Sequence, residues 1–325
     1  MRLIMGWVAG LVFLMCSGAC CGVGMPEFVT SSPDGACQYF DCDLMVGGTV
    51  SGRVVTFEAA TGEVTAVSIE PAELADLGLD NGRIIVKPRR VGEGVLAVTL
   101  ASYEPMKLPI RTAVLATTEV VPDRSIEGLQ RVDPPGRKQM FEGSTLRVVA
   151  EHRDAAGLRL LGHGFEAWTI SGGTLVEPVT DADSDLDAAL VRDVVASGGP
   201  LITVGARAGG TPLELEVVPA GSTATLELEN GFTIVRGGEL AVAAGARFYV
   251  PVHAFSADGR FIHGLPPGGV LTATVTDATV MMVVADTAQR TLRMQGVAPG
   301  TTELTVAFDG ASATFSVRVT EPTTY

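Results

Sequence analysis

The fold is decided by residues 300–320, which read GTTELTVAFDGASATFSVRVT. The second half of this stretch alternates strictly, with Phe315, Val317 and Val319 separated by small, polar or charged residues. A period of two is the pattern of a β-strand with one buried face. The central Asp309-Gly310 favours the positive backbone angles of a tight two-residue turn. The stretch therefore predicts a β-hairpin that covers one side of an apolar core.

The same ending occurs twice more in the chain. PLITVGAR at 200–207 precedes TPLELEVV at 211–218, and GVLAVTLA at 94–101 precedes KLPIRTAV at 107–114. These endings recur after roughly 100 residues, the size of one antiparallel sandwich domain. Internal duplication is the simplest explanation.

Composition agrees with an all-β chain of more than one domain. A chain of 325 residues is too long for one ordinary core. Apolar residues make up 46% and aromatic residues only 6%, with 39 Gly and 18 Pro, which suits short strands joined by turns. Helix-compatible segments are scarce, and we note only 71–79 and 181–189.

The first twenty residues predict export. Arg2 precedes an uncharged apolar run at 3–15, as in a secretory signal peptide. The run ends in Ser17-Gly18-Ala19 followed by Cys20, which resembles the lipobox of bacterial lipoproteins. The resemblance implies that Cys20 becomes an acylated N-terminus that holds the protein at a bilayer. Ser17 stands where the family usually has Leu, and Cys21 offers a frame shifted by one; a secreted protein and an uncleaved anchor are the alternatives.

Two cysteines follow Cys21 in the sequence, Cys37 and Cys42. In an exported protein this close pair most simply forms a local disulfide. Free or intermolecular thiols are the alternative. A metal site would need two further ligands at suitable spacing, and none follow.

The second and third units resemble the bacterial immunoglobulin-like (Ig-like) repeats of adhesins, intimin- and invasin-type proteins and many cell-surface lipoproteins. The resemblance rests on the stretch 150–157 with its Asp before a Gly turn, on Trp168 and Ser171 after it, and on the hairpin at 300–306. The first unit shares only the hairpin. The resemblance implies tandem Ig-like β-sandwiches, with Trp168 in a core. Short linkers near 116–123 and 219–222 predict a semi-extended rod. We therefore divide the chain into a signal peptide at 1–19, a tether at 20–42, and Ig-like domains at 43–117, 118–220 and 221–321.

Two groups of residues are weak metal candidates. His253 and His263 could face one another across a hairpin, but we favour half-exposed strand positions copied with the repeat, as for His152 and His163. The second group consists of the carboxylates Asp181, Asp183 and Asp185. They are spaced like the start of a calcium loop, but the Gly and the bidentate Glu of such a loop are missing, so a solvated acidic loop is favoured. We expect no metal and no cofactor.

No catalytic motif accompanies these residues. The glycine pairs at 92–94 and 162–164 imitate a dinucleotide fingerprint but open no helix, so we interpret them as hairpin glycines. Phosphate-binding loops, zinc-protease helices and nucleophile elbows are absent from the sequence. We therefore expect a protein that is not an enzyme.

The sequence predicts a lipid-anchored cell-envelope protein at the outer membrane or cell surface. A net charge of −14 spread along the chain excludes nucleic acid as a partner. We expect its Ig-like modules to bind or adhere to another envelope or extracellular macromolecule, either protein or polysaccharide. The alternative is a passive spacer without a ligand. The best candidates for an exposed aromatic cluster are Tyr249, Phe255 and Phe261, although alternation places some of them in the core.

Overall fold

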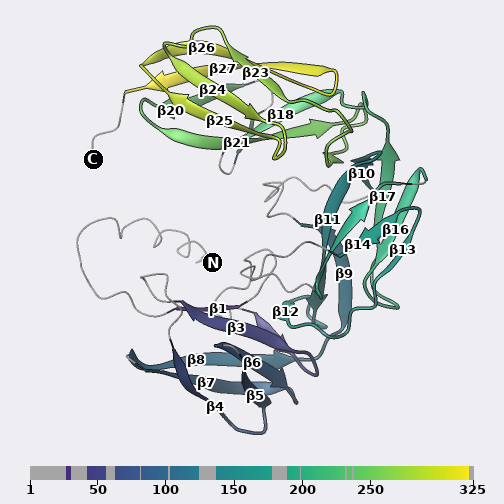
Figure 1. Cartoon of the computed structure of the whole chain (residues 1–325), viewed down its shortest axis with the longest axis vertical. Coiled ribbons are helices and arrows are strands. Elements are labelled where there is room, and N and C mark those ends of the chain that lie inside the picture. Colours follow the sequence, from purple (N-terminus) through teal and green to yellow (C-terminus); the bar gives the residue numbers. More distant parts are fainter. Residues whose placement is uncertain are drawn as a thin grey trace, which may run out of the picture.

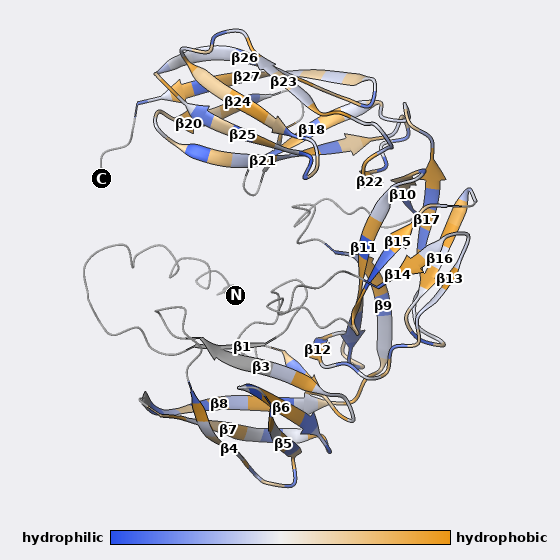
Figure 2. Cartoon of the chain, in the orientation of Figure 1, coloured by the Kyte–Doolittle hydropathy of each residue, from blue (hydrophilic) through white to orange (hydrophobic). Residues whose placement is uncertain are grey.

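The computed structural model describes residues 27–30, 42–55, 63–80, 82–101, 103–123, 137–177, 189–197, 199–230, 233–235 and 238–321. Every regular element in these ranges is a β-strand, which confirms the all-β prediction. The same ranges contain no helix of the length and apolarity needed to cross a membrane. In Figure 2 the strands alternate between hydrophobic and hydrophilic colours, as expected where one face of each sheet is buried.

Module 1, as we call the first sandwich, packs sheet β1-β3-β6-β5 against strands β2-β8-β7-β4. Its core includes the fully buried Leu44, Ile84 and Leu96. Two expectations change here: β1 lies inside the segment assigned to the tether, and the helix-compatible stretch 71–79 is a turn followed by β5. The strands are β1 (Glu27–Thr30), β2 (Asp43–Met45), β3 (Val50–Val55), β4 (Val64–Glu70), β5 (Ala75–Asp80), β6 (Arg83–Pro88), β7 (Gly92–Leu100) and β8 (Tyr103–Ala113).

Module 2 packs β13-β16-β17-β10 against β14-β15-β11-β12, with β9 also paired to β11. Most of the expected linker 116–123 is therefore strand β9. Trp168 lies at the margin of the core rather than at its centre, and its indole N–H donates to the Ala189 carbonyl at 2.9 Å. The strands are β9 (Thr117–Pro122), β10 (Lys138–Phe141), β11 (Thr145–Arg153), β12 (Arg159–Leu161), β13 (Thr169–Ser171), β14 (Thr174–Val176), β15 (Val191–Val195), β16 (Leu201–Gly205) and β17 (Leu213–Val218).

Module 3 packs β19-β18-β21-β25-β24 against β20-β27-β26-β23. The hairpin predicted from residues 300–320 is β26 and β27, and φ angles of 49° at Asp309 and 84° at Gly310 confirm its tight turn. The strands are β18 (Thr225–Asn230), β19 (Thr233–Val235), β20 (Glu239–Ala243), β21 (Arg247–Phe255), β22 (Ile262–His263), β23 (Thr272–Val275), β24 (Met281–Asp286), β25 (Thr291–Gly296), β26 (Gly300–Phe308) and β27 (Ala311–Thr320).

The fold is a tandem array of Ig-like β-sandwiches. Each module is closed by the repeated final hairpin, and the three cores hold mostly aliphatic residues from both sheets. In Figure 1 the modules follow an arc, not the semi-extended rod expected from short linkers.

Strand pairing across both joints accounts for this arrangement. Strand β2 of module 1 pairs in parallel with its own β8 on one edge and with β12 of module 2 on the other. Strand β10 of module 2 does the same, with its own β17 and with β22 of module 3. Sheets therefore continue from one module into the next, so the joints are part of the folded structure.

Side chains also cross the joints. Leu161 of β12 belongs to the core of module 1, and Phe141 of β10 belongs to the core of module 3. The Phe141 ring lies edge-on to Phe308, with centroids 6.1 Å apart. The Asp309 carboxylate accepts hydrogen bonds from the backbone N–H of Gly221 at 2.6 Å and the hydroxyl of Thr223 at 2.8 Å. One turn thus closes the last hairpin and holds the connection between modules 2 and 3.

Candidate binding surface

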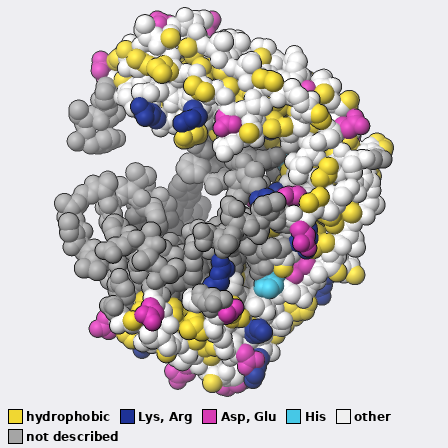
Figure 3. Space-filling view, in the orientation of Figure 1, with side chains coloured by type: hydrophobic (Ala, Val, Ile, Leu, Met, Phe, Trp, Pro, Cys, Tyr) yellow, Lys and Arg dark blue, Asp and Glu magenta, His cyan; other side chains and the backbone are white. Residues whose placement is uncertain are grey.

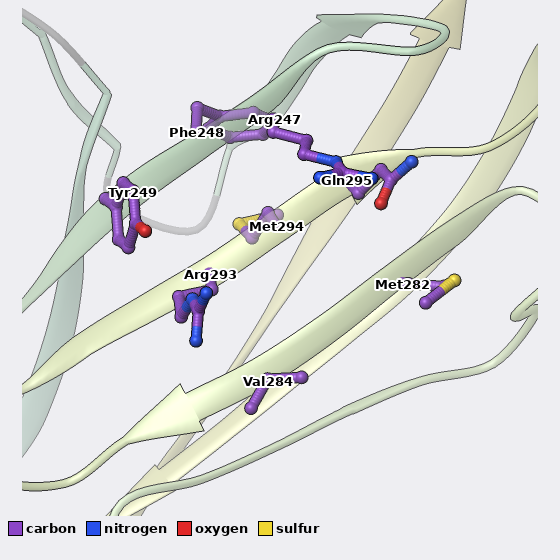
Figure 4. A pocket seen from close by; sticks show the side chains of 8 residues that line it. All are labelled: Arg247, Phe248, Tyr249, Met282, Val284, Arg293, Met294 and Gln295. Atoms are coloured by element: carbon purple, nitrogen blue, oxygen red, sulfur yellow. The ribbon is translucent and has the colours of Figure 1, made fainter.

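The outer face of strands β21, β25 and β24 in module 3 carries an unusual set of side chains. The strand register places Tyr249 beside Arg293, and Arg293 beside Val284. The next row along the strands is Arg247, Gln295 and Met282. We call these six residues the Tyr249 face; Figure 4 shows their side chains, with Tyr249, Arg293 and Val284 following one another across the three strands.

Three large side chains on this face are open to solvent. The exposed fractions are 64% for Tyr249, 52% for Met282 and 58% for Val284. Outward positions of an antiparallel sheet normally carry polar residues, so three exposed apolar side chains on one face depart from that pattern. Strand β24 is hydrophobic along most of its length in Figure 2, and Figure 3 shows hydrophobic side chains gathered on module 3 beside dark blue basic ones.

Two arginines give the face a positive charge in an acidic protein. The Arg293 guanidinium carbon lies 5.7 Å from the centroid of the Tyr249 ring, and Arg247 lies in the neighbouring row. Neither arginine forms an ion pair with any residue that the structure describes. Together with Phe248 and Met294, the face lines a shallow pocket of 280 Å³. Tyr, Met and Arg are the residue types enriched at the centres of protein interfaces.

The face ends at a sheet edge. In the part of the chain that the structure describes, β24 is the last strand of its sheet, and Met282 and Val284 lie on it. Such an edge offers unpaired backbone groups beside the apolar side chains. A partner can therefore add hydrogen bonds to apolar contact here.

Only one of the three aromatic residues expected to cluster at the surface lies there. Phe255 and Phe261 are 4% and 2% exposed, and their rings contact each other at 5.7 Å between centroids. The expectation that some of these rings lie in the core is confirmed, and the three rings do not form one exposed cluster. Phe255 occupies the end of β21 that is buried at successive residues, where the alternation seen at Tyr249 has ended.

The histidines considered as metal ligands are core residues. His253 and His263 are 1% and 0% exposed, which contradicts the expected half-exposed positions. The Phe261 ring contacts both, with centroids 5.5 Å from His253 and 4.6 Å from His263. His253 Nε2 lies 2.8 Å from a Glu229 carboxylate oxygen. No three His, Cys, Asp or Glu side chains gather at ligand distance within the described ranges, and Asp181, Asp183 and Asp185 lie outside them.

The histidines are not copies of one position either. Both hairpin turns are closed by the same backbone bond, Asp154 N–H to Leu158 O in module 2 and Ser256 N–H to Arg260 O in module 3. At the bridge before the turn, Arg153 faces Arg159, whereas Phe255 faces Phe261. Glu151, the equivalent of His253, pairs with both arginines. The duplicated hairpin therefore holds ion pairs in module 2 and aromatic contacts in module 3.

His152 forms a different buried pair. Its Nε2 lies 2.6 Å from Glu166 Oε1, and its Nδ1 lies 3.0 Å from the Thr118 hydroxyl. Burial acts to raise the pKa of Glu166, but hydrogen bonds from His152 and from the Gly164 N–H outweigh it, and the pKa is lowered from its ordinary 4.5. The ionised form of Glu166 is therefore the one that the fold stabilises.

We expect Glu166→Gln to lower the free energy of unfolding by about 1–3 kcal/mol at pH 7, because it weakens a buried hydrogen bond to a charged group. The contribution of a carboxylate with a lowered pKa is complete above about pH 4.5 and is lost as the pH falls through the folded-state value. Urea unfolding should thus show a larger difference between the variant and the original chain at pH 7 than at pH 3. Exposed Glu177→Gln is the control, and an equal difference at both pH values would contradict the assignment.

Of the predicted cysteine sites, the described ranges contain only Cys42. Cys42 is disulfide-bonded, so its partner lies outside those ranges. Cys37, Cys20 and Cys21 lie outside them as well, so the pairing of Cys37 with Cys42 and the acylation of Cys20 stay predictions.

Comparison with known proteins yields similarity to solved structures alone. No family model and no curated protein matches the chain. Domains 4–9 of the surface-layer protein SbsC match at 14% identity and a TM-score of 0.31, covering 92% of this chain and 48% of theirs. The Escherichia coli adhesin FdeC matches at 13% identity and a TM-score of 0.24, and the match covers 92% of this chain and 98% of the FdeC chain. Invasin, a bacterial integrin-binding protein, matches at 12% identity and a TM-score of 0.25, and the match covers 91% of this chain and 60% of the invasin chain. This chain spans about half of the SbsC fragment, and likenesses at such TM-scores carry no argument about its function.

Proposed function

We propose that this chain is a lipid-anchored protein of the bacterial cell envelope, without enzymatic activity, that binds another envelope or extracellular protein through the Tyr249 face. Anchoring rests on the lipobox-like sequence that ends in Cys20. An outer-membrane or cell-surface location follows from that anchor and from the adhesin-like repeat pattern of the sequence.

The exposed apolar face carries the proposal. Tyr249 on β21 and Met282 and Val284 on β24 are all more than half exposed on the same face of the sheet, on either side of β25, where solvent alone would favour polar residues. Aliphatic side chains outnumber the single aromatic ring, which favours a protein partner over a polysaccharide, since sugar sites depend on aromatic stacking and dense hydrogen bonding. Arg247 and Arg293 favour a partner surface with carboxylates around an apolar centre.

Photo-crosslinking in the cells that make the protein tests this proposal. A benzophenone side chain in place of Met282 is expected to give one discrete adduct of higher mass. The same group in place of Val176, which is 45% exposed on module 2, is the matched control and is expected to give none. Absence of an adduct from both Met282 and Val284 would reject the binding function.

The adduct should depend on the centre of the face. With the crosslinker at Val284, Tyr249→Ser is expected to reduce adduct formation at least tenfold, since loss of an interface centre costs about 2 kcal/mol or more. The same substitution should change the free energy of unfolding by no more than about 0.5 kcal/mol, because the side chain is exposed. Equal loss of adduct and of stability would assign Tyr249 to the fold.

Location and anchoring are tested together. Proteinase added to intact cells is expected to degrade the protein, and mass spectrometry of the N-terminal peptide is expected to find acylated Cys20. Protection until the outer barrier is broken would place the protein in the periplasm. An unmodified Cys20 would reject the lipid anchor.

The second candidate function is that of a passive spacer. The observation that favours it is strand pairing across both joints, which fixes the modules relative to one another. A spacer needs no ligand, so it predicts no discrete adduct at any position of the Tyr249 face.

A further inference from the structure

Strand β20 of module 3 occupies the place that β2 and β10 occupy in modules 1 and 2. It runs parallel to the last strand of its own module, with Val242 opposite Val319, as β10 does with Met140 opposite Val217. A glycine of positive φ follows each strand: Gly47 at 80°, Gly143 at 72° and Gly245 at 83°. The three strands are therefore equivalent elements of the repeat.

Only β20 has a free outer edge. The outer edges of β2 and β10 each receive a short parallel strand from the following module, β12 and β22 respectively. Among the described residues, β20 is the terminal strand of its sheet. Ala241 is accordingly exposed, whereas its equivalent in β10, Gln139, is 3% exposed.

The backbone of β20 is oriented to receive such a strand. The Ala244 N–H donates to Thr320 O at 2.9 Å, just as the Glu142 N–H donates to Val218 O at 2.8 Å in module 2. Successive residues of a strand direct their peptide groups to opposite edges, so both groups of Ala241 and the N–H of Ala243 face away from β27. The Ala243 carbonyl accepts the Ala246 N–H at 3.1 Å, as the Phe141 carbonyl accepts the Ser144 N–H in module 2. The free edge therefore presents donors and acceptors in the pattern that β10 presents to β22.

We infer that the outer edge of β20 binds a short strand of a further Ig-like module, which runs parallel to β20 as β12 and β22 run on their partners. A second copy of this chain is a poor source, because its own β12 and β22 are already paired with β2 and β10. The site lies in the sheet opposite the Tyr249 face, so it stands independently of the proposed function.

Charge at the acceptor edge specifies the partner further. At the joint of modules 2 and 3, Glu216 lies across from Gln139 and pairs with Arg260, which precedes the entering β22. The residue across from Ala241 is Arg318, 57% exposed and paired with Glu239. At the joint of modules 1 and 2, Arg111 holds the place of Arg318 and pairs with Asp43, and the entering module carries Leu158 in the place of Arg260. The module that binds β20 is therefore expected to carry no basic residue at that place.

A chain with an appended module tests whether a short strand binds to the outer edge of β20. We would append a second copy of residues 219–321 after Glu321, with Arg260→Glu in the copy, and follow amide hydrogen exchange by NMR. Exchange at Ala241 and Ala243 is expected to slow on the order of 100-fold relative to the original chain, as for amides recruited into a sheet. Leu240 and Val242, which face β27, should exchange alike in both proteins. A copy that keeps Arg260 should protect Ala241 less.

A variant of the acceptor edge gives the control. Ala241→Pro in the original module removes the outward N–H but leaves the bonds to β27, since proline is tolerated on an edge strand. It should abolish the protection at Ala243. Rapid exchange at Ala241 while the β26 and β27 amides of the appended copy are protected would overturn the inference. Equal protection of Ala241 by appended copies with and without the Arg260→Glu substitution would overturn the charge requirement. Protection of Ala241 that rises with the concentration of the original chain would overturn the choice of partner.

Discussion

Phe141→Ala is expected to lower the free energy of unfolding of module 3 by about 3–5 kcal/mol, although Phe141 belongs to a strand of module 2. The side chain is fully buried in the core of module 3, where its ring meets Phe308. Truncation leaves a cavity that the surrounding sheets can close only in part. The strand that carries Phe141, β10, also pairs with β22. The substitution is therefore expected to weaken the packing between modules 2 and 3.

Amide exchange measured module by module tests this expectation. The β26 and β27 amides of module 3 should lose protection in Phe141→Ala, with a smaller loss at β16 and β17 of module 2. Phe165→Ala is the matched control, because Phe165 is 36% exposed in module 2. Loss of protection confined to module 2 would show that the joint does not couple the modules.

Arg290→Ala should have an effect of similar size, about 3–5 kcal/mol, because it leaves buried carbonyl groups without a charged donor. Arg290 is 7% exposed. Its guanidinium donates to the carbonyl oxygens of Ile262 at 2.8 Å and Gly264 at 2.9 Å, and its Nε donates to Val252 O at 3.2 Å. It thus ties β22 to β21, and β22 is the strand that enters the joint.

Two further variants separate the geometry of Arg290 from its charge. Arg290→Lys keeps the charge but lacks the planar fork that reaches three carbonyls, so it should recover less than half of the lost stability. Arg293→Ala, on the exposed Tyr249 face, should change the free energy of unfolding by no more than about 0.5 kcal/mol. Urea unfolding measures both. Full recovery by lysine would assign the effect to charge alone.

Sequence patterns predicted the elements whose side chains alternate over many residues. Phe315, Val317 and Val319 mark β27 because one face of a long strand is buried along its whole length. The turn at Asp309-Gly310 followed from local backbone preference. These signals lie within one hairpin and depend on no distant residue.

The joints and the binding face could not be predicted in the same way. Strand β22 is two residues long and β12 is three, too short to carry a period. Their pairing with β10 and β2 joins residues far apart in the chain, which no local pattern records. The sequence made Tyr249 and Phe261 equal candidates for an exposed aromatic residue. Only the strand pairing of the folded chain shows that Tyr249 is exposed and that Phe261 lies in the core.

The sharing of Leu161 and β12 with module 1 sets an order of maturation. The chain is synthesised from its N-terminus, so the last strand of module 1, β8, is complete before Leu161 has been made. Before β12 pairs with β2, the outer edge of β2 and the space that Leu161 fills in the core of module 1 are exposed to solvent. The edge of β10 is exposed in the same way before β22 pairs with it. Modules 1 and 2 therefore each expose a strand edge and part of a core until the next module completes them.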